Sequence, residues 1–195
     1  MPAPGSPLVF VDRDGVINRD SDEYIKSVAE WQPLPGSLEA IAALTAAGRI
    51  VVVITNQSGI GRGLFSRATL AEIHAAMIAA VEAAGGRIAA LYYCPHRPDD
   101  DCDCRKPKPA MILRAAAELG QPLEGSCLIG DKGSDVEAAI AAGIRPIIVG
   151  DRVAEGAYEG VARFADLRAA AAALLADAEG SAERRDGAAP SGGGA

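Results

Sequence analysis

Two carboxylates, Asp12 and Asp14, close an apolar run near the start of the chain, Leu8-Val9-Phe10-Val11-Asp12-Arg13-Asp14-Gly15. The run has the composition of a buried parallel strand, and residues two apart on an extended backbone point to the same side. We therefore expect Asp12 and Asp14 to share a face that Arg13 does not, with Gly15 allowing a turn. Such a pair can act as nucleophile and acid/base or hold a divalent cation. For one such motif taken alone, a strand that simply ends in polar turn residues is the favoured interpretation, and the rest of the chain reverses that preference.

A second group of reactive side chains is clustered at 94–104. Cys94 and His96 are followed by Cys102 and Cys104, so three thiols and one imidazole fall within eleven positions. A Cys₃His set is a common closed ligand set for structural zinc. Packed or incidental thiols are the alternative, but three of four cysteines and one of two histidines crowd into this hydrophilic loop. That crowding predicts a structural zinc loop, since closed coordination leaves no position for a reacting water.

The elements that must position these residues alternate along the chain. We expect short apolar strands at 8–11, 50–54, 88–93, 127–129 and 147–149, and helices at 36–47, 66–84, 109–119, 134–142 and 166–176. This alternation predicts an α/β fold with a doubly wound (Rossmann-like) parallel sheet and helices on both faces. No large insertion separates the segments, so we expect no large cap domain.

The carboxyl ends of these strands bring the candidate residues together. Asp12 and Asp14 follow the first strand, Thr55 and Asn56 the second, and Asp131 the strand at 127–129. Ligands of doubly wound sheets bind beyond the carboxyl ends of the strands. The topology therefore predicts one crevice that these five residues share.

A phosphate monoester suits this crevice. Its negatively charged oxygens repel a carboxylate nucleophile, so a cation must neutralise both. Asp12, Asp131 and the backbone carbonyl of Asp14 form an oxygen ligand set for Mg²⁺. Asp12 would then attack phosphorus to form an aspartyl-phosphate, while Asp14 would protonate the leaving oxygen and later take a proton from water.

Three further residues complete the expected set. Thr55 can hydrogen-bond a transferring oxygen, and Lys106 supplies a compact positive charge. Asp135 falls in the first turn of an expected helix, where a carboxylate is favourable in any case. For Asp135 a helix-terminal role and a role in supporting the metal or the lysine both remain open.

Four segments resemble, in order, the four motifs of the haloacid dehalogenase superfamily of phosphatases. They are Asp12-Arg13-Asp14-Gly15-Val16, Thr55-Asn56, Lys106 and Gly130-Asp131-(x3)-Asp135, and the resemblance covers residues 8–150. It implies Mg²⁺-dependent phosphoryl transfer through Asp12, with Asp14 as acid/base. Each motif is weak alone, and their order at successive strand ends makes the match specific.

A zinc loop that precedes Cys104-Arg105-Lys106-Pro107 is similar to one branch of that superfamily, the heptose 1,7-bisphosphate and histidinol-phosphate phosphatases. The segment 55–63, TNQSGIGRG, resembles the heptose enzymes' T-N-Q-S-G-I-A-R-G, with Gly61 in place of Ala. The chain departs again at Ala110, where Gly is usual, and at 151–160, which lacks an expected Thr-Gly-x-Gly turn. The resemblance implies a substrate pocket formed by Asp20, Tyr24, Asn56, Gln57, Ser58, Arg105, Lys106 and Lys132.

Three functions are compatible with these residues. The first is hydrolysis of the C7 phosphate of D-glycero-D-manno-heptose 1,7-bisphosphate for lipopolysaccharide core synthesis, with Arg62 and Arg105 as candidates for the second anion. The second is histidinol-phosphate hydrolysis, with Asp20, Asp22 or Glu23 facing the substrate amine. The third is a zinc-stabilised binding module, for example for nucleic-acid ends, that has lost catalysis. The intact acidic set and the acidic net charge count against this module.

Composition narrows the setting. The chain has 195 residues and a net charge of −7, which predicts one domain over 1–176 and disfavours nucleic-acid or anionic membrane partners. Residues 177–195 are rich in Gly, Ala and Ser, and we expect a disordered tail there. The first residues lack the pattern of a secretory signal, and we expect a cytoplasmic monomer that acts on a small phosphorylated sugar.

Overall fold

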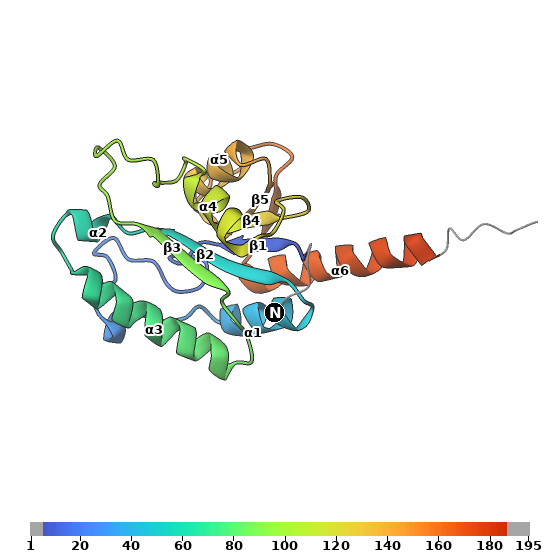
Figure 1. Cartoon of the computed structure of the whole chain (residues 1–195), viewed down its shortest axis with the longest axis horizontal. Coiled ribbons are helices and arrows are strands. Elements are labelled where there is room, and N and C mark those ends of the chain that lie inside the picture. The colour runs from blue at the N-terminus through green and yellow to red at the C-terminus, as the bar shows by residue number, and fades with distance from the viewer. Residues whose placement is uncertain (1–5, 187–195) are drawn as a thin grey trace, which may run out of the picture.

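The structure, a computed structural model, describes residues 6–186, with side chains described as far as Ala178. A six-stranded sheet forms its centre, in the order β3-β2-β1-β4-β5-β6, and every neighbouring pair is parallel (Figure 1). The strands are β1 (Leu8–Val11), β2 (Ile50–Asn56), β3 (Ala90–Cys94), β4 (Cys127–Gly130), β5 (Arg145–Val149) and β6 (Ala162–Phe164). The predicted doubly wound parallel sheet is confirmed.

Helices cover both faces of this sheet. In Figure 1, α1, α3 and α6 lie below it, while α4 and α5 lie above it. The helices are α1 (Ser37–Ala46), α2 (Ser58–Gly61), α3 (Arg67–Ala83), α4 (Ala110–Leu119), α5 (Gly133–Ala141) and α6 (Leu167–Asp186), with a 3₁₀ turn η1 (Val28–Glu30). The result is a three-layer α/β/α arrangement, as the alternation of elements predicts.

The two cores follow from the alternation of side chains along the central strands. On β1, Val9 and Val11 pack among residues of α1, α3 and α6, whereas Leu8 and Phe10 pack among residues of α4 and α5. All four are at most 2% exposed, because β1 is covered on both faces and flanked by β2 and β4. Continuous burial explains why the strand reads as an unbroken apolar run.

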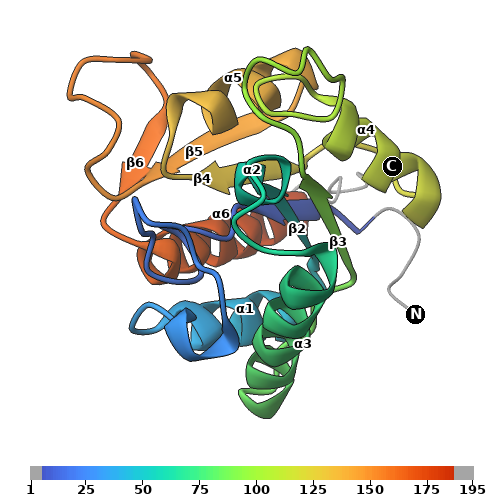
Figure 2. The same cartoon turned by 90° about the vertical axis from the view of Figure 1, so that its left-hand side faces the viewer.

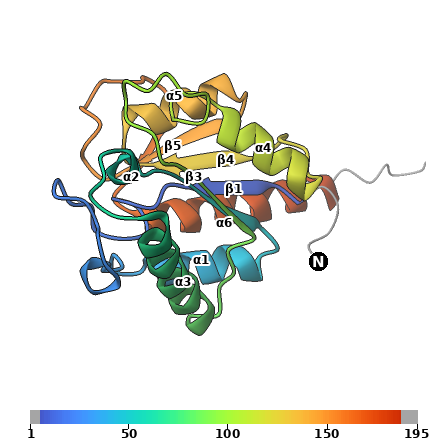
Figure 3. The same ribbon diagram turned by 60° about the vertical axis from the view of Figure 1, so that its left-hand side comes forward.

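The strand order reverses at β1, which is the point where a crevice forms in such sheets. The chain builds β2 and β3 on one side of β1 and β4, β5 and β6 on the other. Figure 2 looks onto the edge where the strands end, and α2 and the loops after β1 and β3 lie there. Figure 3 shows the same loops from an oblique direction, grouped at the end of the sheet away from the end of α6.

Two elements escaped the sequence-based assignment. Strand β6 was not predicted, because its three residues include the exposed Arg163 and its only partner is β5 at the edge of the sheet. The Arg163 guanidinium donates to the carbonyl oxygens of Val153, Ala154 and Ala157, and so closes the loop between β5 and β6. The short helix α2 was not predicted either, since one turn has no apolar period.

The last helix is longer than expected. Asp166 caps it as predicted, with its carboxylate accepting from the N–H of Ala169 at 2.8 Å. The helix continues to Asp186, so the prediction of disorder is wrong for 177–186. Ala, Glu and Arg there have high helix propensity, which the low hydrophobicity of the segment concealed. The remainder of the predicted tail, 187–195, lies outside the described residues.

Long loops, not a second domain, surround the carboxyl edge within residues 6–186. The two longest connections there that lack an α-helix are 12–36 after β1 and 95–109 after β3. This agrees with the expectation of no large cap domain. None of the described helices is both long and apolar enough to cross a membrane.

Candidate active site

Three buried aspartates meet where β1 and β4 end. Asp12 follows β1, Asp131 follows β4, and Asp135 lies in the first turn of α5, and one oxygen of each lies within 4.8 Å of the others. The backbone N–H of Asp12 donates to the carbonyl of Ile129 at 3.0 Å, which holds the two strand ends together. Only glycine fits at position 130, because a Cβ there would collide with the side chain of Asp135. Three carboxylates this close need cations.

Lys106 is the cation the protein itself provides. Its side chain is 3% exposed, and Nζ lies 2.9 Å from Oδ1 of Asp12 and 2.6 Å from Oδ1 of Asp135. Nζ also donates to the carbonyl of Ile54 at 3.0 Å. Burial alone would lower the pKa of Lys106, but the two carboxylates outweigh it and raise that pKa above its usual value. Lys106 is therefore a permanent charge in this site.

Asn56 places the backbone of Lys106. Its side-chain amide donates to the carbonyl of Lys106 and accepts from the N–H of Lys106, both at 3.1 Å. Lys106 lies on the loop after the zinc-ligand candidates and has no regular secondary structure to fix it. The double hydrogen bond from the end of β2 therefore holds the loop and its cation in register with the sheet.

Asp131 has the strongest unmet need for a cation. It is 2% exposed, neither of its oxygens accepts a hydrogen bond, and Arg152 Nε lies 3.4 Å from Oδ2. Burial raises the pKa of Asp131 to about 7, and the neighbouring Asp12 and Asp135 add to that rise, while Lys132 and Arg152 oppose it. Desolvation likewise raises the pKa of Asp12, against the effect of Lys106.

These residues fit a hard divalent cation. Mg²⁺ prefers carboxylate and carbonyl oxygens and retains several waters. Asp131 offers two buried oxygens without hydrogen bonds, next to Asp12. A Cβ on Gly15 would collide with the Asp131 carboxyl, so glycine keeps this space open, at a φ of +86° that suits glycine. Asp12 and Asp131 can therefore hold Mg²⁺ together with the carbonyl of Asp14.

Asp14 lies beside this centre in a fixed orientation. Its side chain is 13% exposed and lines the cavity, and each of its oxygens accepts two hydrogen bonds. The donors are Arg13 Nε and Asn18 to Oδ1, and Arg13 Nη2 and Gln57 to Oδ2. Gln57 also donates to the Thr55 hydroxyl at 2.9 Å, which ties the acid/base candidate to the oxygen-binding candidate.

A cavity of about 330 Å³ opens onto these groups. It contains 12 of the residues predicted for catalysis or substrate binding or weighed as alternatives: Asp12, Asp14, Asp20, Asp22, Tyr24, Thr55, Asn56, Gln57, Ser58, Arg105, Lys106 and Lys132. Tyr24 has a positive φ of 63°, and loop 12–36 presents it to the cavity. Arg62 is exposed at the end of α2 and is not among the residues that line this cavity.

One wall of the cavity carries a cation that sequence reasoning missed. Arg152, in the loop between β5 and β6, lies 2.9 Å from Oδ2 of Asp20, and Lys132 Nζ lies 2.9 Å from the same oxygen. Burial opposes the charge of Lys132, but Asp131, Asp12 and Asp20 raise its pKa. The only sequence signal that could have drawn attention to Arg152 is the absence of the expected Thr-Gly-x-Gly turn from its segment, 151–160.

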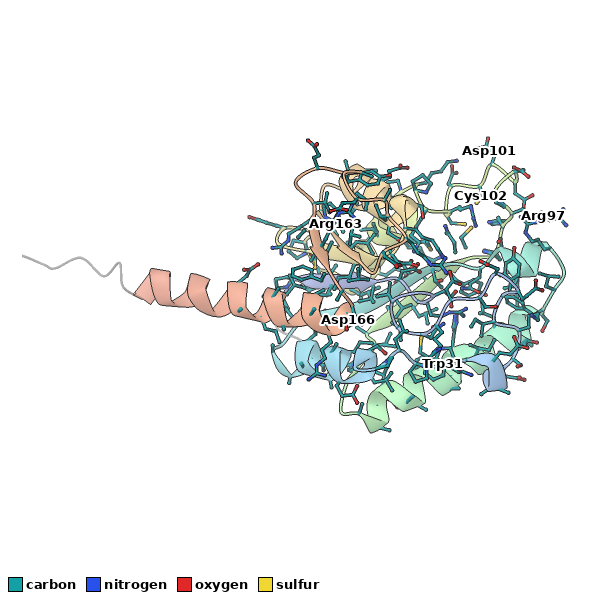
Figure 4. The ribbon with its side chains drawn as sticks, turned by 180° about the vertical axis from the view of Figure 1, so that it is seen from behind. Trp31, Arg97, Asp101, Cys102, Arg163 and Asp166 are labelled. Carbon is teal, nitrogen blue, oxygen red and sulfur yellow. The ribbon has the colours of Figure 1, made fainter. Side chains whose placement is uncertain are left out.

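The thiols and imidazole of the zinc loop are also brought together. Cys94 Sγ lies 3.5 Å from Cys102 Sγ and 3.6 Å from His96 Nδ1, while Cys104 Sγ lies 3.7 Å from Cys102 Sγ and 3.2 Å from His96 Nδ1. Zn–S and Zn–N bonds of about 2.3 and 2.0 Å give tetrahedron edges of about 3.8 and 3.5 Å. The four atoms therefore have the spacing of one tetrahedral zinc site. Figure 4 labels Cys102 on this loop, at the end of the molecule opposite the end of α6.

Comparisons with known proteins agree with this geometry. A family model described as HAD-hydrolase-like matches residues 103–176. The D-glycero-beta-D-manno-heptose-1,7-bisphosphate 7-phosphatase of Pseudomonas putida is 52% identical over 174 residues, which cover 86% of this chain and 99% of that protein. The counterpart in Pseudomonas aeruginosa is 48% identical over 175 residues, which cover 86% of this chain and 97% of that protein.

A solved structure matches the fold as a whole. The D,D-heptose 1,7-bisphosphate phosphatase of Bordetella bronchiseptica, solved with magnesium and phosphate, superposes with a TM-score of 0.83 at 46% identity. The match covers 88% of this chain and 99% of that one. A relative with the same fold has therefore been observed with magnesium, the metal that the oxygen ligands described above fit.

Proposed function

Since this chain belongs to the haloacid dehalogenase-like hydrolases, within the family of its heptose-bisphosphate phosphatase relatives, we propose that it hydrolyses a heptose bisphosphate with Mg²⁺. The substrate is D-glycero-D-manno-heptose 1,7-bisphosphate and the bond cleaved is its C7 phosphate ester, a step toward the lipopolysaccharide core. One observation carries the proposal. Asp12, Asp14 and Lys106 line a cavity with further cations on its walls, and the buried Asp131 lies directly behind Asp12 without lining the cavity itself.

Asp12 is the nucleophile. Lys106 and the N–H of Arg13 both bond to Oδ1 of Asp12, at 2.9 and 2.7 Å, which fixes the carboxylate and leaves Oδ2 to attack phosphorus. Mg²⁺, held by Asp12, Asp131 and the carbonyl of Asp14, supplies the positive charge that brings the phosphate and the carboxylate together. Thr55 donates to an oxygen of the phosphoryl group as it moves to Asp12. Lys106 contributes its positive charge there, because its three N–H groups are directed at Asp12, Asp135 and the carbonyl of Ile54.

Asp14 moves the protons. It first protonates the sugar oxygen that leaves phosphorus, and then takes a proton from the water that attacks the aspartyl-phosphate. The water oxygen bonds to phosphorus, the bond from phosphorus to Asp12 breaks, and inorganic phosphate leaves. Support comes from the location of Asp14 on the cavity wall and from its hydrogen bond to Gln57, which also bonds Thr55.

Short loops provide the substrate specificity. Arg105, Lys132 and Arg152 line the cavity and are the candidates for the second phosphate of a bisphosphate. Asn56, Gln57 and Ser58 line the cavity beside them, and Asp20 and Tyr24 complete its outer wall. Arg62, outside this lining, has no part in the proposal.

Histidinol phosphate is the weaker candidate. Of the carboxylates expected to face its amine, Asp20 already lies 2.9 Å from both Lys132 and Arg152, which leaves Asp22 as the one other such carboxylate that lines the cavity. The relatives at 46–52% identity cited above carry the heptose name. A binding module without catalysis would not require three buried carboxylates with a buried lysine, because these groups are costly to fold.

Zn²⁺ completes the proposal as a structural ion held by Cys94, His96, Cys102 and Cys104. The loop that carries these ligands ends directly before Arg105 and Lys106, so zinc fixes the backbone of both cations. We further propose a cytoplasmic monomer, in a compartment where thiols remain reduced and available to zinc.

The decisive experiment is phosphate release by purified protein with Mg²⁺. The α and β anomers of the heptose bisphosphate and histidinol phosphate are compared in parallel, with Asp12→Asn as the inactive control. We expect a large kcat/KM preference for one heptose anomer. Preference for histidinol phosphate would move the protein to amino-acid synthesis, and no release from any of the three would overturn the proposal.

A further inference from the structure

The largest fully buried side chain of the described residues is a charged one, Arg13, the residue between the two catalytic aspartates. The backbone turns sharply there, with the N–H groups of Ile17 and Asn18 donating to the carbonyl of Arg13 at 2.9 and 3.1 Å. This turn corrects the expectation that Arg13 points away from both carboxylates. Its guanidinium lies against Asp14.

Nearly every donor of Arg13 is used. Nε and Nη2 donate to the two oxygens of Asp14, both at 2.9 Å, and Nη2 also donates to Gln57 Oε1 at 3.2 Å. Nη1 lies 3.2 Å from His74 Nε2. A buried guanidinium requires such partners, because each unpaired N–H group would cost free energy.

His74 comes from α3 and is 6% exposed. An arginine can only donate, so His74 Nε2 must be the unprotonated ring nitrogen that accepts. Burial and the charge of Arg13 lower the pKa of His74 to about 4, against the effect of Asp14, so the ring is neutral at physiological pH. The ring of Tyr93, at the end of β3, meets it edge-on at 5.8 Å and fixes its tilt.

We propose that His74 and Arg13 are positioning residues that hold the Asp14 carboxylate in place for its proton transfers. The inference rests on the proposed function, because it concerns the acid/base group of that reaction. His74 accepts from Nη1 and thereby directs the other two nitrogens of the guanidinium to Asp14. Neither residue lines the cavity, so neither contacts the substrate.

The network fixes both oxygens of the Asp14 carboxylate. Arg13, Asn18 and Gln57 donate all four of its hydrogen bonds, two to each oxygen. Both proposed proton transfers pass through this carboxylate, so its displacement should lower kcat. Neither Arg13 nor His74 lines the cavity, so KM should change little.

The test compares His74→Leu with His74→Gln. Leu packs but cannot accept from Arg13, whereas Gln retains an acceptor oxygen. We expect kcat to fall about tenfold in His74→Leu with KM little changed, which corresponds to about 1.4 kcal/mol in the activation free energy. A merely structural role of His74 would lower the stability of the protein without this split between kcat and KM. His74→Gln should recover most of the rate.

Controls separate the alternatives. Glu72→Gln, on the exposed side of the same helix, should behave as the native chain. Equal losses in the Leu and Gln variants, or a less stable His74→Leu protein with normal kcat, would overturn the positioning role. If the native chain itself releases no phosphate, the proposed function fails, which is a different result.

Discussion

Asp131→Asn should change how the stability of the Mg²⁺-free protein depends on pH. The folded-state pKa of Asp131 is about 7, above the ordinary value of 3.8 that the group has in the unfolded chain. Between these values the folded chain binds the proton and the unfolded chain does not, so this group makes the protein less stable as the pH rises. Asn cannot titrate, and the variant should lose this dependence.

The structure sets the magnitude. Between about pH 5 and about pH 7, Asp131 is protonated in the folded chain and ionised in the unfolded chain; above about pH 7 it is ionised in both. Over these roughly two pH units the free energy of unfolding falls by about 1.36 kcal/mol per unit, or about 2.7 kcal/mol by pH 8. His74 has the opposite slope, since its folded-state pKa of about 4 lies below 6.5. His74 is present in both proteins, and its effect cancels in the comparison.

The assay is urea unfolding at both pH values in buffer freed of Mg²⁺ without a strong chelator, which would also remove zinc. The native chain should lose about 2.7 kcal/mol more than Asp131→Asn between the two pH values. Added Mg²⁺ at high pH should restore the native chain and not the variant. Asp151→Asn, an exposed carboxylate in the loop that carries Arg152, is the matched control. Parallel pH profiles for the native chain and Asp131→Asn would refute the argument.

Three other substitutions test the remaining parts of the site. Asp12→Asn should lower kcat by about 10³-fold or more and form no phosphoenzyme in a folded protein, and substantial turnover would remove Asp12 as nucleophile. Lys106→Met should reduce the free energy of unfolding in urea by about 3–5 kcal/mol, because it leaves buried carboxylates without their cation, and native stability would contradict the ion pairs. Cys102→Ser should lower both the zinc content and the thermal stability of the protein. The control Cys127→Ala, outside the proposed zinc ligands, should keep its zinc. An unchanged zinc stoichiometry in Cys102→Ser would exclude the tetrahedral ligand set.

The sheet and the centre of the site could be predicted because they depend on local patterns. Strands such as β2 are buried on both faces and are read directly as apolar runs. Asp12 and Asp131 follow such strands and Thr55 lies near the end of β2, so the topology alone brings them to one edge. Lys106 was predicted from its motif as a positive charge, and the structure pairs it with Asp12 and Asp135, where the role of Asp135 had been left open.

What could not be predicted depends on the partners that distant side chains choose. Arg13 and His74 are 61 positions apart, and nothing in either local pattern pairs them. Arg152 reaches the site from a loop that β6 closes, and β6 itself is too short and too charged to be recognised. α6 continues past the point where its apolar pattern ends, in a segment whose Ala, Glu and Arg residues have high helix propensity.

The negative charge of the buried centre explains why it contains a lysine and why the pKa of Asp131 is raised. Asp12, Asp131 and Asp135 carry three negative charges when ionised, and the buried Lys106 offsets one. Arg152 also approaches Asp131, but it is 44% exposed and shared with Asp20, so an excess of negative charge remains for a divalent cation. Without that cation the folded chain must accommodate the excess, and a raised pKa for Asp131 is how it does so. A substitution that relieves the excess, such as Asp131→Asn, should also remove the ligand that holds Mg²⁺. The site is therefore stable and active in the same state, the one with its metal bound.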